Sequence, residues 1–270
     1  DEARLIDVAA AWLRCPQGRV LPMAGASAAI QILPRVIAPG RAAVLTPSYN
    51  EHAASLRAAG WQVSAAPEIA AMEGADLAVV VNPNNPDGRE WSPAALTALA
   101  GRVGTLVVDE SFADPRPDLS LIPVLPENAV VLRSFGKFWG LAGLRLGFAV
   151  ARPDLLAALR EAAGPWAVGG PALAIGAAAM VDTAWADAAV TYHAEAALNL
   201  DRLALRGGWR PVGGTHLFRL YDTPDARAAQ EALARAHVWT RRFPYSDRWL
   251  RLGIPGDRDE FDRLEAALRP

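Results

Sequence analysis

The feature that most constrains the fold of this chain is a regular alternation of short apolar runs with alanine-rich helical stretches. We expect strands at 42–46, 62–65, 77–81, 105–109, 130–134 and 146–150. Several of these runs are continuous stretches of Val and Leu, which is the pattern of a parallel strand covered on both faces. Strands that alternate with helices predict an α/β fold with a mostly parallel, doubly wound sheet.

Helix signals fall between these strands. Ser92 followed by Pro93 is typical of a helix start, with an N-cap and a proline at the first helical position, and this helix is expected to end near Gly101. A helix over 50–59 is closed by Gly60. The pattern of 28–36 is also helical.

The character of the sequence changes after residue 153. Helices are expected over 154–163, 225–235 and 259–268, with a long helical region over 171–206, and strands over 209–220, 237–243 and 249–252. This order predicts a large cofactor-binding domain at 1–165 and a smaller C-terminal α+β domain at 166–270, with the boundary near 164–170.

Composition excludes several classes of function. The chain has 270 residues, and 52% of them are hydrophobic, so it can bury a large core. A net charge of -2 gives no electrostatic footprint for nucleic acid or for an anionic membrane. A single cysteine, Cys15, excludes an internal disulfide and favours a reducing compartment, so we expect a cytoplasmic protein. The four histidines are widely spaced, so no metal site is expected. The apolar stretch 171–186 includes Asp182 and is interpreted as a buried helix.

Polar residues follow three of the predicted strands. The strand at 77–81 leads to Asn85, the strand at 105–109 ends in Asp109, and the strand at 130–134 leads to Lys137. If these strands are parallel, their carboxyl ends meet at one edge of the sheet, where open α/β sheets bind ligands. Taken singly, each of these sequences is also compatible with an ordinary turn or a solvated loop.

Lys137 is the only lysine in the chain. An amine condenses with an aldehyde to form a Schiff base, whereas a guanidinium does not. Because arginine supplies every other long cationic side chain, this position favours amine chemistry rather than charge alone.

A fourth element lies upstream, where Gly25, Ala26 and Ser27 precede a helical pattern. A small turn at a helix N-terminus presents backbone N–H groups and a positive dipole end to a phosphate. Ser134 and Arg145 flank Lys137 and can add phosphate ligands, Arg145 through a charge-assisted contact. An amine, a carboxylate, an amide and a phosphate cradle together indicate pyridoxal 5'-phosphate.

The ordered set Asn-Pro-x-Asn-Pro-x-Gly, Asp-Glu-x-aromatic and Ser-x-x-Lys followed by Gly-Leu-Arg-x-Gly resembles the class I/II aminotransferases of fold type I. Within that family the chain resembles the branch of histidinol-phosphate aminotransferases and cobalamin-pathway threonine-phosphate decarboxylases. The resemblance runs from Gly25 to Arg251 and implies pyridoxal phosphate as the cofactor.

The resemblance also implies a role for each matching residue. Lys137 would form the internal aldimine and move protons, with its pKa lowered by burial beside the cofactor. Asp109 would pair with the pyridine nitrogen. Asn85 would bind the phenolic oxygen, and Tyr49 would stack on the ring. The phosphate would be held by Gly25, Ala26, Ser27, Ser134 and Arg145, and an anionic group of the substrate by Arg251.

The residue after Asp-Glu-x is Phe112, where many aminotransferases have a tyrosine that donates a second hydrogen bond to the cofactor. Phenylalanine here resembles the threonine-phosphate decarboxylase branch. We therefore expect decarboxylation of L-threonine O-phosphate to aminopropanol O-phosphate in cobalamin biosynthesis. Histidinol-phosphate aminotransferase, or another class I/II aminotransferase, is the alternative.

Substrate orientation selects between these reactions, and the candidate substrate ligands are Arg251, Arg241, Arg242 and His216. The sequence leaves open which arginine holds a phosphate and which a carboxylate. A cofactor-sensing regulator would need a basic DNA-binding helix, and no such helix is found in the sequence. The resemblance further implies a homodimer with a small phosphorylated amino-acid substrate, and an N-terminal arm that is missing before Asp1.

Overall fold

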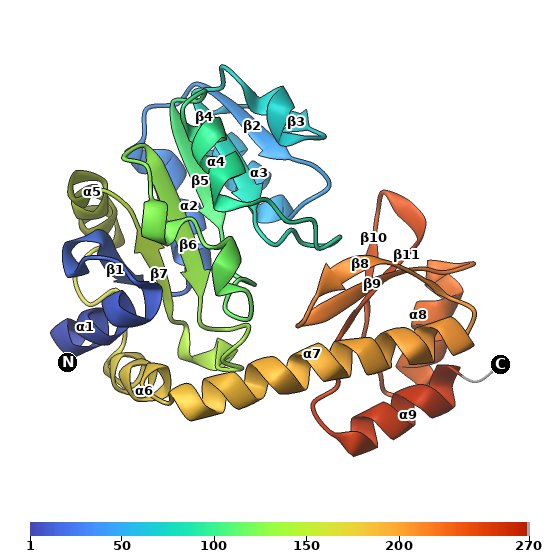
Figure 1. Ribbon diagram of the computed structural model, residues 1–270. Helices are drawn as coiled ribbons and strands as arrows, with labels where there is room; N and C mark the ends of the chain where they lie inside the picture. The colour runs from blue at the N-terminus through green and yellow to red at the C-terminus, as the bar shows by residue number, and fades with distance from the viewer. Residues whose placement is uncertain (269–270) are drawn as a thin grey trace. The chain divides into compact units, whose positions relative to one another are not determined.

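The computed structural model describes residues 1–268, which fall into two compact units (Figure 1). The first unit comprises Asp1–Asn84 and Glu90–Thr183, and the second comprises Asn85–Arg89 and the chain from Ala184 onward. The predicted division into functional domains at residue 165 stays a prediction.

A seven-stranded sheet forms the centre of the first unit. In spatial order its strands are β1 (Val20–Met23), β7 (Gly147–Val150), β6 (Ala129–Ser134), β5 (Thr105–Asp109), β4 (Leu77–Val81), β2 (Arg41–Leu45) and β3 (Gln62–Ala66). The strands from β6 to β3 are parallel, whereas β7 is antiparallel to both of its neighbours. This sheet confirms the predicted mostly parallel α/β fold.

Helices cover both faces of this sheet (Figure 1). The helices of the unit are α1 (Glu2–Leu13), α2 (Ala26–Val36), α3 (Asn50–Ala58), α4 (Pro93–Ala100), α5 (Pro153–Ala163) and α6 (Gly170–Met180). A core of buried aliphatic residues joins one face of the sheet to α2, α3 and α5, while α4 packs on β5 and α1 on β1 and α6. Burial on both faces explains why the parallel strands are continuous apolar runs. The predicted cap is present, because Ser92 Oγ accepts a hydrogen bond of 3.2 Å from the Ala95 amide.

The second unit is built on a four-stranded antiparallel sheet. Its strands, in spatial order, are β10 (Arg241–Phe243), β11 (Ser246–Gly253), β9 (Phe218–Asp222) and β8 (Arg210–Thr215). Its helices are α7 (Thr183–Arg206), α8 (Ala226–Arg235) and α9 (Arg258–Leu268). Leu200, Tyr221, Leu250 and Leu264 are among the residues of its buried core, which confirms the predicted α+β character.

Several predicted elements differ from the structure. The single strand expected at 209–220 is a hairpin, β8 and β9, that turns at His216 and Leu217, where the Leu217 amide donates to Thr215 Oγ1 at 3.0 Å. The strand expected at 237–243 begins only at Arg241, because His237 has a left-handed φ of 60°. The helical region expected at 171–206 is broken into α6 and α7.

Two elements have no counterpart in the sequence-based prediction. β1 contains Pro22, which interrupts the strand signal but is tolerated at the edge of a sheet. α1 also lies in this N-terminal part of the chain. Within residues 1–268, no single helix has the length and apolar composition needed to cross a membrane. Helices α6 and α7 meet the length and composition criteria only when they are taken together, and they are bent by 78° where they join.

Candidate active site

Three neighbouring strands of the first unit end at the same edge of the sheet. β4 pairs with β5 and β5 with β6, all parallel, so their carboxyl ends point the same way. Asn82 follows β4, Asp109 ends β5, and Ser134 ends β6. This edge is where a doubly wound sheet binds its ligand.

Asp109 is a buried carboxylate with a defined set of donors. Its Oδ2 lies 2.9 Å from His52 Nε2, and its Oδ1 accepts from the Ser111 amide at 3.0 Å and from Ser111 Oγ at 2.5 Å. Burial alone would raise the pKa of Asp109, but the hydrogen bond and charge of His52 and the hydrogen bonds of Ser111 outweigh it, so the pKa is lowered. The carboxylate is therefore held ionised. It offers about four acceptor positions, of which these partners use three.

The sequence-based prediction missed His52 and Ser111. His52 lies on α3, three residues after Tyr49, and the two rings meet edge to face with centroids 6.1 Å apart. Tyr49 immediately precedes the predicted helix over 50–59, and its i, i+3 spacing to His52 was the available signal, because residues so spaced lie on one face of a helix. Ser111 directly follows Asp-Glu, but nothing in the sequence distinguished it from a loop serine.

Lys137 lies on an exposed loop whose neighbours are buried aromatic residues. Its Nζ is 5.6 Å from the centroid of the Phe112 ring. Phe135 stacks on Trp139 with centroids 5.0 Å apart, and Phe138 meets Trp139 edge to face at 5.3 Å. These contacts fix the loop, in which Lys137 itself is exposed.

The predicted phosphate cradle depends on two glycines. Gly25 is the N-cap of α2 with φ 81°, and a Cβ added there would lie 2.8 Å from Arg145 Nη2. A Cβ on Gly147 would lie 2.4 Å from the Ala26 backbone nitrogen, and Gly147 pairs in register with Ser134. The α2 N-terminus, Arg145 and Ser134 are therefore gathered in one place. Backbone N–H groups, a helix dipole and a guanidinium are the donor set that suits a phosphate, so these residues fit the group.

Asn85 belongs to the second unit, where Arg251 Nη1 donates to its Oδ1 at 2.5 Å. The segment that carries Asn85 packs tightly on β8. A Cβ on Gly88, which has φ 73°, would lie 2.1 Å from the Gly214 carbonyl oxygen. The last glycine of the Asn-Pro-x-Asn-Pro-x-Gly sequence therefore permits this close approach.

The second unit separates the predicted substrate arginines into a pair and a single residue. Arg241 is the register partner of Arg251 across β10 and β11, so their side chains share one face. Burial lowers the pKa of Arg251, and the nearby positive charge of Arg241 lowers it further. Arg242 is on the opposite face, where its Nε donates to Gln230 Oε1 at 2.7 Å. The structure therefore brings Asn85, Arg241 and Arg251 together and places Arg242 elsewhere.

Two further residues of this unit bear on the site. His216, a predicted substrate ligand, lies in the turn between β8 and β9. Burial lowers the pKa of His193 on α7, and the charge of nearby His216 lowers it further. Tyr245 was not predicted. Burial, followed by the charge of Asp87, raises its pKa to about 12, against the lowering effect of Arg241 and Arg251. The phenol therefore lies within electrostatic reach of the arginine pair.

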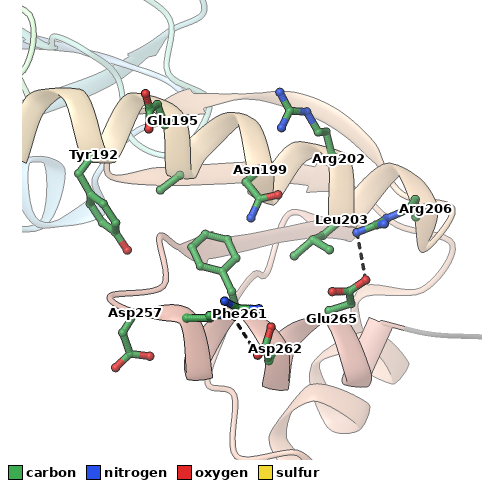
Figure 2. Close-up of a pocket in the computed structure, with 12 residues that line it drawn as sticks. Tyr192, Glu195, Asn199, Arg202, Leu203, Arg206, Asp257, Phe261, Asp262 and Glu265 are labelled. Carbon is green, nitrogen blue, oxygen red and sulfur yellow. Dashed lines mark ion pairs between the residues drawn. The ribbon is translucent and has the colours of Figure 1, made fainter.

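A separate groove of about 530 Å³ lies between α7 and α9 (Figure 2). It contains none of the predicted site residues. Its three arginines face four carboxylates, and Arg206 is paired with Glu265 at 3.1 Å. Because its charges nearly cancel, this groove does not suit a doubly charged anion. Among residues 1–268, no cluster of three or more His, Cys, Asp or Glu side chains is arranged to hold a metal ion.

Comparison with known proteins relates this geometry to a family. The family model for aminotransferase class I and II matches residues 5–268. The threonine-phosphate decarboxylase of Pseudomonas aeruginosa is 44% identical over 96% of this chain and 81% of its own length. A protein of the same name from Sinorhizobium sp. is 43% identical over 99% of this chain and 82% of its length. A histidinol-phosphate aminotransferase from Mycobacterium tuberculosis is 35% identical over 92% of this chain and 72% of its length.

Solved structures share the fold. Histidinol-phosphate aminotransferase from Sinorhizobium meliloti, in complex with pyridoxal 5'-phosphate, superimposes with a TM-score of 0.87 at 22% identity, covering 99% of this chain and 81% of that one. L-threonine-O-3-phosphate decarboxylase from Porphyromonas gingivalis gives 0.84 at 21%, covering 99% and 88%. The fold, the ordered strand-end residues and the family match agree, and the chain belongs to the aminotransferase class I and II family.

Proposed function

We propose that this protein is a pyridoxal-phosphate-dependent decarboxylase that converts L-threonine O-phosphate to aminopropanol O-phosphate and carbon dioxide, as a step of cobalamin biosynthesis. The observation that carries this proposal is the 44% and 43% identity to two threonine-phosphate decarboxylases over almost the whole chain, against 35% for histidinol-phosphate aminotransferases. Membership of the family makes pyridoxal phosphate the cofactor.

When bound, pyridoxal phosphate supplies an aldehyde for an amine and a ring that withdraws electrons from the substrate α-carbon. In our proposal Lys137 provides the amine and later holds or moves the proton at Nζ. Ionised Asp109, oriented by His52 and Ser111, would pair with the ring nitrogen and keep it protonated. The N-terminus of α2 (Gly25, Ala26, Ser27), with Ser134 and Arg145, would hold the phosphate group. Tyr49 would stack on the ring, and Asn85 would bind its phenolic oxygen.

Phe112 supports the decarboxylase branch. Its ring lies 5.6 Å from Lys137 Nζ, as a tyrosine at this position would also place its ring, but it has no hydroxyl to donate. The hydrogen bond that tyrosine supplies in many aminotransferases is therefore missing here.

The arginine pair supports a substrate with two anionic groups. Arg241 and Arg251 place two guanidinium groups on one face, and no acidic side chain is bonded to either among the described residues. Threonine phosphate carries a carboxylate and a phosphate, and arginine forks suit both. The orientation of the substrate carboxylate selects between decarboxylation and transamination, so this pair would favour decarboxylation by holding that carboxylate in one orientation. His216 and Tyr245 are further candidates to contact the substrate.

The decisive experiment is product analysis after the cofactor-loaded protein is mixed with threonine phosphate and no 2-oxo acid. We expect carbon dioxide and aminopropanol phosphate in equal amounts. In a parallel reaction the protein receives histidinol phosphate and 2-oxoglutarate. Formation of glutamate there, with no carbon dioxide from threonine phosphate, would replace the decarboxylase with an aminotransferase.

Arg241→Ala and Arg242→Ala form a matched pair for the substrate site. The two residues are adjacent in sequence, but only Arg241 shares a face with Arg251. We expect Arg241→Ala to lower kcat/KM by about 100-fold, as the loss of a charge-assisted contact of roughly 3 kcal/mol implies, and Arg242→Ala to stay near wild type. Equal losses in both variants would contradict the assignment of Arg241.

We also propose that the protein acts as a homodimer in the cytoplasm, with residues 1–165 as the cofactor domain and 166–270 as the smaller domain. In the first unit, the exposed apolar side chains of Ile175 on α6 and Val181 just after it support a subunit contact, because large apolar side chains seldom gather on a free surface. Sedimentation of the loaded protein tests this state. A monomer at micromolar concentration that retains full activity would refute it.

A further inference from the structure

A buried ionic cluster lies beside the strand ends that carry the predicted site. Arg133 Nη1 donates to Glu110 Oε2 at 3.0 Å, and Arg133 Nη2 donates to Asp114 Oδ1 at 2.6 Å. The side chains of Arg133, Glu110 and Asp114 are only 7%, 0% and 4% exposed. None of the three has a part in the chemistry proposed above.

Both carboxylates of the cluster also accept hydrogen bonds from outside it. Glu110 accepts from the Leu121 amide and from Ser120 Oγ, both at 2.7 Å, and Asp114 accepts from Trp12 Nε1 at 3.4 Å. Burial raises the pKa of Glu110, although Arg133 and these donors oppose the increase. One cation is therefore held between two carboxylates, each of which accepts at least one further hydrogen bond.

A buried ionic cluster of this kind contributes little to the free energy of unfolding. Removing charges from water is expensive, and a buried ion pair is often matched or exceeded in stability by uncharged side chains of similar volume. A geometric role explains its presence better. Arg133 provides a rigid fork with two donors at a set spacing, which positions both carboxylates at once.

The cluster is attached to the site through the two central strands. Glu110 directly follows Asp109, and Arg133 directly precedes Ser134. Because side chains alternate along a strand, the cluster and the site project from opposite faces of the same strand ends. The Glu110 amide also donates to the Leu132 carbonyl oxygen at 2.9 Å, so backbone and side chains join β5 to β6 at this level.

We propose that Arg133 is a positioning residue that, through Glu110 and Asp114, fixes the separation between Asp109 and the segment carrying Ser134 and Lys137. This inference rests on the proposed roles of Asp109 and Lys137. A displacement near 1 Å between catalytic groups is enough to lower a rate by about 100-fold. Loss of the fork therefore acts on kcat and on cofactor affinity more than on KM.

The test separates geometry from stability with three variants. Arg133→Met leaves two buried carboxylates without their cation, so it loses stability, cofactor affinity and kcat together. The neutral variant Glu110→Gln/Asp114→Asn/Arg133→Met removes all three charges and keeps acceptor oxygens for the Leu121 amide. We expect it to recover the stability of the apoprotein while kcat stays about 10- to 100-fold low and cofactor affinity stays weakened.

Val131→Ala is the matched control, because Val131 lies on the same face of β6 two residues earlier and is fully buried. It creates a cavity and loses stability, and we expect its kcat and cofactor affinity to remain within about two-fold of wild type. Urea unfolding of the apoproteins, cofactor titration and initial rates give the three readouts.

Recovery of both kcat and affinity in the neutral variant would overturn the proposal, and so would a loss of kcat in Val131→Ala equal to that in Arg133→Met. If the neutral variant does not fold, Arg133→Lys replaces it, since lysine keeps the charge but lacks the fork. It is expected to lower kcat at an unchanged KM, and a wild-type kcat would refute the role. Cofactor affinity does not depend on which reaction follows, so failure of the decarboxylase assignment is recognised separately.

Discussion

Gly147→Ala is the sharpest test of the phosphate cradle. A methyl group at this position would lie 2.4 Å from the Ala26 nitrogen, 2.7 Å from the Arg133 carbonyl oxygen and 2.7 Å from the Gly25 carbonyl carbon. All three are backbone atoms, so no side chain can rotate away to make room. The α2 N-terminus must therefore move away from the ends of β6 and β7, by roughly 1 Å if ordinary contacts near 3.5 Å are to be restored.

The size of the effect follows from this geometry. Overpacking in a close-packed interior costs about 1–3 kcal/mol, which corresponds to a fall in Tm of roughly 2–12 °C for a domain of this size. The same movement draws the N–H groups of Ala26 and Ser27, at the start of α2, away from Arg145 and Ser134. We therefore expect cofactor affinity to fall by about 10- to 100-fold, the equivalent of one or two weakened hydrogen bonds to a charged group.

Gly143→Ala provides the control. Gly143 lies in the same Gly-Leu-Arg-x-Gly sequence, has no atom within 4 Å of an added Cβ and has no positive φ. Its substitution should change stability by less than about 0.5 kcal/mol. Thermal unfolding of the apoproteins and cofactor titration by tryptophan fluorescence measure both effects. Wild-type affinity in Gly147→Ala, with the loss of stability present, would show that the α2 N-terminus does not bind the phosphate.

Three further predictions address individual residues. Lys137→Ala should abolish the visible absorption band of the Schiff base between the protein and the cofactor, and an unchanged band would exclude Lys137 as the attachment point. His52→Ala should destabilise the apoprotein by about 1.5–3 kcal/mol at pH 7, because a buried charged acceptor loses its donor. The fold lowers the pKa of Asp109, so ionised Asp109 stabilises the fold at pH values above 3.8, the ordinary pKa of an aspartate. This stabilisation is lost as the pH falls through the lowered pKa. The unfolding curves of wild type and His52→Ala should therefore converge only at strongly acidic pH. In the second unit, Asp201→Ala should cost about 2–3 kcal/mol in urea unfolding, since it leaves Arg219 and the buried Tyr221 hydroxyl without their acceptor, and a change below 0.5 kcal/mol would contradict this reading.

The sequence was most informative where local pattern and tertiary burial coincide. Continuous Val/Leu runs such as β4 predicted parallel strands correctly, because burial on both faces leaves no other pattern. The common edge at which β4, β5 and β6 end also followed from sequence, because parallel strands have their carboxyl ends on the same side of the sheet.

Features that depend on contacts between distant residues were not predicted. The hairpin of β8 and β9 was predicted as one strand, because Gly213 and Gly214, the residues most typical of a turn, lie within β8. The turn itself is at His216 and Leu217 and is stabilised by the hydrogen bond from the Leu217 amide to Thr215 Oγ1. The separation of Arg241 from Arg242 follows strand alternation, but the face that Arg251 occupies is known only once the register of β10 with β11 is known. His52 became a partner of Asp109 only when α3 was packed on the sheet.

The segment Asn85–Arg89 has a consequence for any attempt to divide this protein. Although it is only a few residues long and interrupts the first unit in sequence, its packing partners lie in the second unit. A Cβ on Gly88 would lie 2.1 Å from the Gly214 carbonyl oxygen, and a Cβ on Gly213 would lie 2.0 Å from the Asp87 carbonyl oxygen, so neither glycine can be replaced by a larger residue without moving the backbone. A fragment expressed from Ala184 onward would expose that surface of β8 and lose the hydrogen bond from Arg251 to Asn85. The second unit is therefore not encoded by one contiguous stretch of gene, and recombination with a relative at residue 184 alone would exchange β8 without the segment that fits it.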